Sequence, residues 1–263
     1  MESLLATYVT GQVATFMMVF ARMGTAIMVM PGIGDSFVSS RVRLLFAFAF
    51  VAVITPMISP LVPDLNMNSP VFLWVMVREL VIGFFIGTVA RIFMTALDTG
   101  GMIISMQTGL GNAMVFNPQM AGQGSIIGAF LSITGAVLLF STNLHHLLIY
   151  ALVDSYKTFA MGADFPLVEG MAQTIAKAVA QSFQIGFYMA VPFMMVSLLL
   201  YICMGVLGRL MPQIQVFILA LPIQILLGFL TLFTVTSTVL LYWIGEYDSA
   251  IRMFFSDMGG IDG

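Results

Sequence analysis

The first residues that could perform catalysis are two aspartates that stand next to glycine or tyrosine. Gly32 to Asp35 reads Gly-Ile-Gly-Asp, and Tyr247 precedes Asp248. Intramembrane aspartyl proteases use such a pair, with the Tyr-Asp element first and both aspartates inside spans, so that the two carboxyls share a proton. Here the order is reversed, Asp35 lies at the end of an apolar span, and Asp248 lies in the C-terminal tail. We interpret residues 32–35 as a glycine-rich helix stop.

The two histidines offer a possible metal site, but their spacing is unfavourable. His145 and His146 are adjacent, so on a helix their side chains point about 100° apart and cannot bind one metal ion as an i,i+4 pair does. We expect them to form hydrogen bonds in a packed interior or at a membrane interface. The sequence also contains no HExxH motif, phosphate-binding P-loop or serine nucleophile elbow. It predicts a protein that is not an enzyme, with no catalytic residue, metal site or cofactor.

The composition predicts an integral membrane protein. Of the 263 residues, 60% are hydrophobic and only 8% are charged, with a mean hydropathy of +1.05. Soluble domains carry about 25% charged residues, so the chain lies far outside that class. The net charge of −3 gives no indication of a nucleic-acid partner.

The apolar stretches predict an all-α, polytopic membrane protein of long, kinked helices and hairpins. A helix needs about 20 apolar residues to span a bilayer, and several stretches are longer, so these helices must tilt, kink or project beyond the membrane. The six expected spans are residues 4–30, 42–62, 70–97, 125–153, 171–201 and 213–245. We expect breaks at residues 98–101 and 205–212, and a frayed tail from Glu246 onward.

Charged side chains in or beside these spans predict polar contacts inside the protein or with other chains. A charge at mid-bilayer costs at least about 2.5 kcal/mol on insertion scales, so each should face a partner or an aqueous cavity. Arg91 and Asp98 are seven residues apart on one helix face, and a side chain or a water molecule between them could link the two. Arg78 and Glu79 point in different directions, and we expect their partners elsewhere, including on another subunit. The predicted charge network comprises Arg22, Arg78, Glu79, Arg91, Asp98 and Lys177.

Two glycines predict close contact between helices. Gly83 and Gly87 form a GxxxG pair, a spacing that lets two helix backbones approach each other. This pair supports association with other helices of this chain or of other chains.

The segment 107–124, in the middle of the chain, is neither a good helix nor an ordinary loop. It contains four glycines, three glutamines, two asparagines and a proline, and these disfavour a helix. Its apolar residues, such as Leu110 and Phe116, disfavour a solvated loop. Irregular backbone at membrane depth is tolerated only when it is buried in protein or lines a water-filled cavity. The segment is therefore predicted to lie in a protein interior or a pore.

Taken in order, these stretches resemble the FliR/SctT family of export-gate proteins of type III secretion systems. The resemblance covers essentially the whole chain, and it is strongest over residues 78–87 and 101–118, which include Gln-Thr-Gly-Leu at 107–110. It is carried further by residues 30–33, 40–44, 54–56, 139–145, 152–156 and 207–214.

The resemblance implies a subunit that assembles with FliP-like and FliQ-like proteins around a pore for unfolded secreted proteins. FlhB-like and FlhA-like export proteins and membrane lipid are further implied partners. The location is the bacterial inner membrane, at a flagellar or injectisome basal body, with much of the assembly above the membrane plane. Residues 1–200 correspond to a FliP-like part, residues 201–245 to a FliQ-like hairpin turn and last long helix, and residues 246–263 to a short tail.

Two functional segments are implied by the same resemblance. One is a loop at residues 106–124 that plugs the closed pore, and its site residues are Gln107, Gly109, Leu110, Gly111, Asn112, Met114, Phe116, Asn117 and Met120. The other is a loop at the cytoplasmic mouth, with Arg209, Pro212, Gln213 and Gln215.

Two alternatives stay open at this point. A secondary transporter would use glycine-broken helices and intramembrane charges to form a midplane site, and it predicts inverted repeats, which we do not find in the sequence. A structural scaffold would nucleate the assembly without forming a gate.

Overall fold

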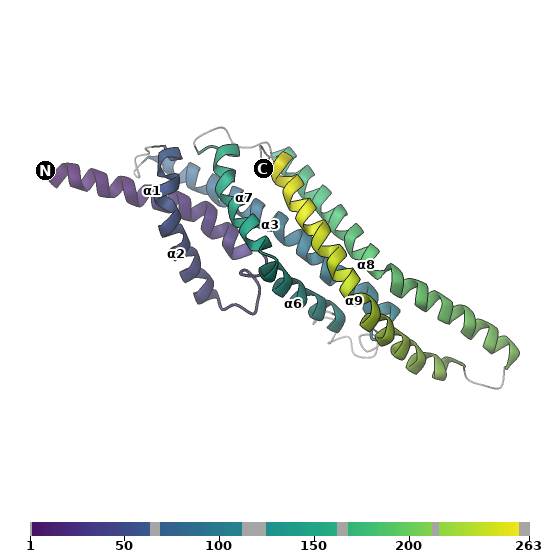
Figure 1. Ribbon diagram of the computed structural model, residues 1–263. Coiled ribbons are helices and arrows are strands. Elements are labelled where there is room, and N and C mark those ends of the chain that lie inside the picture. The colour runs from purple at the N-terminus through teal and green to yellow at the C-terminus, as the bar shows by residue number, and fades with distance from the viewer. Residues whose placement is uncertain (1, 64–68, 112–124, 162–167, 212–215, 258–263) are drawn as a thin grey trace. The chain divides into compact units, whose positions relative to one another are not determined.

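The computed structural model describes residues 2–63, 69–111, 125–161, 168–211 and 216–257, and within these ranges it is helical without strands (Figure 1). This confirms the predicted all-α fold. The elements are α1 (Glu2–Val29), α2 (Ser40–Ile58), the short 3-10 helix η1 (Ser59–Leu61), α3 (Pro70–Gln107), α6 (Ile126–Ser141), α7 (Leu144–Thr158), α8 (Val168–Leu210) and α9 (Val216–Asp257).

The lengths and composition of these helices confirm a polytopic membrane protein. Among the described residues, five helical stretches are long and apolar enough to cross a membrane. The pair α6 and α7 makes a sixth span if it is counted as one, although it is bent by 73° at its break. At the bend, Asn143 has a φ of 61°, in the left-handed region that asparagine tolerates better than most residues. The sequence predicted a single span over residues 125–153, without a bend.

Helix α3 does not break at residues 98–101, so that expectation is wrong. It runs for 38 residues through both glycines. A Cβ on Gly100 would lie 2.9 Å from the Gly186 carbonyl oxygen of α8, and one on Gly101 would collide with the Gly128 backbone of α6. Glycine serves here to let neighbouring helices approach, and its helical backbone remains hydrogen-bonded, as an apolar environment requires.

Two further expected interruptions, at residues 205–212 and from Glu246 onward, begin later than predicted. Helix α8 extends to Leu210, past Gly205. One glycine costs only about 1 kcal/mol in a helix, which is less than the cost of leaving backbone groups unpaired in lipid. Helix α9 extends to Asp257, and Tyr247, Ile251 and Phe254 form a buried stripe at helical spacing. Apolar packing therefore orders the first part of the predicted tail.

The chain divides into two compact units, and the first contains residues 1–92, 139–178 and 250–263. Its core is made of apolar side chains of α1, the first part of α3, α7 and the end of α9. A Cβ on Gly83 would collide with the Arg22 carbonyl oxygen of α1, and one on Gly87 would lie 2.8 Å from the Ala26 carbonyl oxygen. The predicted GxxxG contact is thus made, and it is made within this chain.

The second unit contains residues 93–138 and 179–249. It comprises the end of α3, most of α6, and the long helices α8 and α9, which lie alongside each other as a hairpin (Figure 1). Trp243 of α9 is fully buried, and its indole Nε1 donates a hydrogen bond to the Phe93 carbonyl oxygen at 3.2 Å. This contact fixes α9 against α3 within the unit.

Candidate functional site

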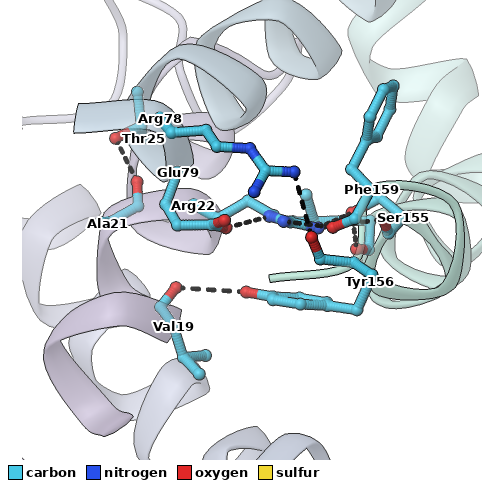
Figure 2. Close-up of polar contacts among 11 residues, drawn as sticks. Val19, Ala21, Arg22, Thr25, Arg78, Glu79, Ser155, Tyr156 and Phe159 are labelled. Atoms are coloured by element: carbon cyan, nitrogen blue, oxygen red, sulfur yellow. Dashed lines mark hydrogen bonds and ion pairs between the residues drawn. The ribbon is translucent and has the colours of Figure 1, made fainter. Parts of the chain in front are cut away.

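A buried charge cluster lies at the centre of the first unit. Arg22 of α1 and Glu79 of α3 are both fully buried, and Arg22 Nε donates to Glu79 Oε2 at 2.5 Å. The guanidinium carbon lies 4.1 Å from the centre of the Tyr156 ring of α7, close enough for a cation–π interaction. Figure 2 shows the Arg22 side chain between these groups, with Glu79 on one side and α7 on the other.

The same arginine also closes the C-terminal end of α7. Its Nη1 donates to the Ser155 carbonyl oxygen at 2.9 Å, and its Nη2 donates to the Phe159 carbonyl oxygen at 2.7 Å (Figure 2). Arg78 Nη2 donates to the Ala160 carbonyl oxygen at 3.0 Å. The last carbonyls of a helix have no partner within the helix, and a cation there also opposes the negative end of the helix dipole. Two arginines therefore hold the end of α7.

Arg78 and Glu79 were expected to find partners elsewhere, and the structure shows partners for both within the same chain. The partner of Glu79 is Arg22, 57 residues earlier in the same chain. The Arg78 side chain turns to the segment after α7. The Arg22 guanidinium and Glu79 Oε2 are paired within the fold, as buried charges in an apolar protein require, whereas the second carboxylate oxygen, Glu79 Oε1, is buried with no hydrogen-bond partner among the described residues.

A second ion pair lies at the end of α1. Arg91 Nη2 lies 3.2 Å from Asp35 Oδ1, and Arg91 Nη1 donates to the Val29 carbonyl oxygen at 3.1 Å. Asp35 Oδ2 accepts a hydrogen bond from the Gly32 amide at 2.8 Å, and Gly32 has a φ of 84°. The structure confirms the glycine-rich helix stop, and it assigns Asp35 to holding the turn.

The structure shows other partners for Arg91 and Asp98 than the predicted bridge between them. Asp98 accepts a hydrogen bond from the Ser132 hydroxyl of α6. Lys177 is exposed on α8, and Arg209 is exposed in the last turn of that helix. The structure thus brings Arg22, Arg78 and Glu79 together, and it leaves the other predicted members of the network apart from them.

The histidines do not form a metal site. The His145 and His146 rings lie with their centres 4.1 Å apart at the start of α7, and Phe140 packs on His145. In the part of the chain that the structure describes, no group of three or more histidine, cysteine, aspartate or glutamate side chains could hold a metal ion.

The beginning of the segment 107–124, which we call the central segment, lies in the second unit, at the end of α3. The helix ends at Gln107, and Gly109 then adopts a φ of 78°, the left-handed conformation that commonly ends helices. The Thr108 amide donates to the Ile104 carbonyl oxygen at 2.9 Å, and the Gly111 amide donates to the Ser105 carbonyl oxygen at 2.8 Å. Gln107 is therefore helical, and the irregular backbone begins one residue later.

Polar side chains from the α8–α9 hairpin hold this helix end. Gln224 Nε2 of α9 donates to the Gln107 carbonyl oxygen at 2.8 Å and to the Tyr201 hydroxyl at 3.2 Å. Ser197 Oγ of α8 donates to Gln107 Oε1 at 2.5 Å. We call Gln107, Ser197, Tyr201 and Gln224 the hairpin clamp. Its members come from three helices of one unit.

Little space for water remains in the hairpin clamp. Gln224 and Ser197 are 6% and 5% exposed, and the adjoining cavity has a volume of about 10 Å³, room for about one water molecule. A Cβ on Gly228 of α9 would lie 2.5 Å from Thr108 Cβ, so the helix also packs directly on the turn. The sequence analysis missed Gln224. Its signal was an isolated glutamine within the apolar run Leu-Pro-Ile-Gln-Ile-Leu-Leu.

Several predicted site residues lie outside the described residues. These are Asn112, Met114, Phe116, Asn117 and Met120 of the central segment, and Pro212, Gln213 and Gln215 of the loop between α8 and α9.

Comparison with known proteins identifies the family. A profile for the family described as Bacterial export proteins, family 1, matches residues 13–250. The flagellar biosynthetic protein FliR of Caulobacter vibrioides is 37% identical over 243 residues, which cover 92% of this chain and 96% of the relative. The FliR protein of Bacillus subtilis is 29% identical over 226 residues, covering 85% of this chain and 86% of the relative.

A relative from a second kind of system matches a shorter part of the chain. The Yop proteins translocation protein T of Yersinia pestis is 28% identical over 163 residues, covering 62% of each chain. The family match extends over nearly the whole sequence and agrees with the long apolar helices of the structure. The chain therefore belongs to the FliR/SctT family of bacterial export proteins, as a membrane component of the flagellar and type III export apparatus.

Proposed function

We propose that the protein is a non-enzymatic subunit of the type III export gate, and that it assembles with FliP-like and FliQ-like subunits to form a pore for unfolded secreted proteins. Family membership supports this role. The α8–α9 hairpin supports it as well, because it carries large exposed apolar side chains, including Leu199 at 61% and Phe233 at 88% exposure. Such a surface suits contact with lipid or with neighbouring apolar helices.

The observation that carries the gate proposal is the way in which α3 ends. Irregular backbone starts at Thr108, directly after a helix that is long enough to cross a membrane, and the open carbonyl of Gln107 is satisfied by a buried glutamine. Backbone of this kind is tolerated at membrane depth only inside protein or beside water. The following residues thus start from an interior position, which suits a segment that occupies a pore.

In this proposal, residues 107–124 form the plug of the closed channel. Their glycines and methionines suit an adaptable obstruction, and displacement of the segment would open the pore without unfolding the surrounding helices. The energy for transport comes from other components, since the sequence carries no nucleotide-binding motif.

The remaining parts of the chain have proposed roles in the same assembly. Residues 1–200 are the FliP-like part and residues 201–245 the FliQ-like hairpin turn and last long helix. The loop after Arg209, which includes Pro212, lies at the cytoplasmic mouth, where an FlhB-like partner contacts Gln213 and Gln215 and an FlhA-like protein completes the apparatus. The location is the bacterial inner membrane at a flagellar or injectisome basal body, with much of the assembly above the membrane plane.

Co-expression with the FliP-like and FliQ-like proteins of the same bacterium tests this proposal. Native mass spectrometry of the purified membrane fraction should detect one stable complex that contains all three proteins. A stable monomer that binds neither partner would contradict the proposal. Specific uptake of a small solute by the isolated chain in liposomes would instead favour a secondary transporter.

A further inference from the structure

A buried polar cluster at the end of α3 has no role in membrane insertion, and the amide nitrogen of Gln224 lies at its centre. Gln224 uses its amide nitrogen twice, toward the Gln107 carbonyl oxygen and the Tyr201 hydroxyl. An amide nitrogen of this type has two N–H donors, so none is left for another group. Ser197 binds the Gln107 side chain in addition, and its own hydroxyl lies within reach of the Met194 carbonyl oxygen.

Gln224 also contacts the residue that sets the direction of the chain after α3. A Cβ on Gly109 would lie 3.2 Å from Gln224 Cδ, and Gly109 has a φ of 78°. The glutamine side chain therefore touches both the last helical residue and the left-handed glycine that follows. One turn further along α9, Gly228 packs against Thr108. The hairpin thus contacts each of residues 107, 108 and 109 in turn.

We propose that Gln224 and Ser197 are positioning residues, which couple the α8–α9 hairpin to the start of the central segment. While the hairpin clamp is made, the Gln107 carbonyl has a donor and the turn at 108–111 is held in one place. A shift of α9 relative to α3 would remove that donor from the Gln107 carbonyl, and the adjoining cavity holds only about one water molecule that could replace it. Because an unpaired carbonyl is costly there, the turn at 108–111 moves with the hairpin. This inference rests on the proposed gate only for its consequence in export, because the coupling itself concerns described contacts within one unit.

Accessibility of a cysteine placed in the turn measures this coupling directly. The reporter is Leu110→Cys in a Cys203→Ala background, because Cys203 is exposed and would react with the same maleimide. The complex with its FliP-like and FliQ-like partners is labelled in detergent, and only material with the intact mass in native mass spectrometry is assayed. The test variants are Gln224→Met, which keeps an unbranched side chain without donors, and Gln224→Glu, which keeps the shape and has at most one donor in place of two.

A matched control comes from the same cavity. Thr231 of α9 lines it, but its hydroxyl binds the Leu227 carbonyl oxygen of its own helix at 2.8 Å. Thr231→Val should leave the labelling rate of Cys at position 110 unchanged. Gln224→Met should raise it about tenfold, equivalent to about 1.4 kcal/mol, because the part-buried Gln107 carbonyl loses its donor. Gln224→Glu keeps at most one of the two donors and should raise it about twofold to tenfold. Ser197→Ala and Tyr201→Phe remove single hydroxyls and should raise it about twofold to threefold, so they replace the glutamine variants if those do not assemble.

The outcomes separate the coupling from the plug. Equal labelling rates in Gln224→Met, Thr231→Val and the parent would overturn the coupling. That result would stand even if deletion of residues 109–120 makes the membrane leaky, which would support the plug. Faster labelling in the glutamine variants supports the coupling, even if that deletion leaves ion conductance unchanged and the plug proposal fails. An equal rise in Thr231→Val would also overturn the coupling, since it would show general loosening around the cavity.

Discussion

The Arg22–Glu79 pair gives a prediction in which two substitutions are less harmful than one. Replacing Arg22 by methionine removes the guanidinium that lies 2.5 Å from Glu79 Oε2 and leaves a fully buried carboxylate without its cation. It also takes the donor from the Phe159 carbonyl oxygen and one of two donors from the Ser155 carbonyl oxygen, which keeps the Phe159 amide. Adding Glu79→Met removes the stranded carboxylate while changing nothing at those two carbonyls.

The magnitudes follow from the burial of each group. Breaking a buried ion pair by removing one partner costs about 3–5 kcal/mol, because the other charge stays buried. The part-buried Phe159 carbonyl, which loses its donor, adds about 1 kcal/mol. Arg22→Met should therefore lower the free energy of unfolding by about 4–6 kcal/mol, on the order of the whole stability of many domains. The double variant should recover about 3 kcal/mol of this loss, since only the carbonyl cost remains.

The measurement is a double-mutant cycle in detergent micelles. Unfolding is followed by tryptophan fluorescence as the mole fraction of sodium dodecyl sulfate rises, for the parent, each single variant and the double variant. A shared partner makes the two substitutions strongly non-additive. Additive losses from Arg22→Met and Glu79→Met, or a loss below about 1 kcal/mol for Arg22→Met, would refute the assignment of this pair to the core of the fold.

Three further predictions test other contacts. Gly83→Ala should lower the free energy of unfolding by about 1–3 kcal/mol, because its Cβ would collide with the Arg22 carbonyl oxygen. The control is Gly205→Ala, whose Cβ meets nothing within 4 Å, so it should cost nothing or stabilise α8 slightly. A sodium dodecyl sulfate titration compares the two variants. In thermal unfolding, Asn143→Gly should leave stability unchanged, and Asn143→Ala should lower the free energy of unfolding by about 1–2 kcal/mol, because a φ of 61° disfavours alanine. Equal effects of the two substitutions would show that the left-handed residue does not cause the bend. Asp35→Asn should lower the free energy of unfolding by no more than about 1 kcal/mol in the same assay, because the Arg91 side chain of its ion pair is 41% exposed. A larger loss would show that the ion pair is better shielded from water than the structure indicates.

The helical fold and its membrane character could be predicted from sequence because they depend on composition and on local apolar runs. The ends of the helices were predicted less well. Gly100 and Gly101 indicate a break when they are considered alone, but they lie where α6 and α8 approach α3, a fact that only tertiary packing supplies. The tail from Glu246 was expected to fray because it is acidic, yet Ile251 and Phe254 bury an apolar stripe that keeps it helical.

The polar contacts were the hardest part to predict. The sequence analysis recognised that Arg22 and Glu79 need partners, but nothing local pairs residues 57 positions apart. Arg91 was paired with Asp98 because they share a helix face, and the structure pairs it with Asp35 at the turn after α1 instead. Gln224 drew no attention because it is uncharged, although its position in an apolar helix means that its amide must find partners inside the protein.

The most direct test of the gate is the ion conductance of the assembled complex in a planar lipid bilayer. The complex of this chain with its FliP-like and FliQ-like partners is compared with the same complex lacking residues 109–120, after native mass spectrometry has shown equal subunit content. If the central segment plugs the pore, the parent complex should be closed to small ions and the shortened complex should conduct steadily. Unchanged conductance in a fully assembled shortened complex would contradict the plug and favour a scaffold role.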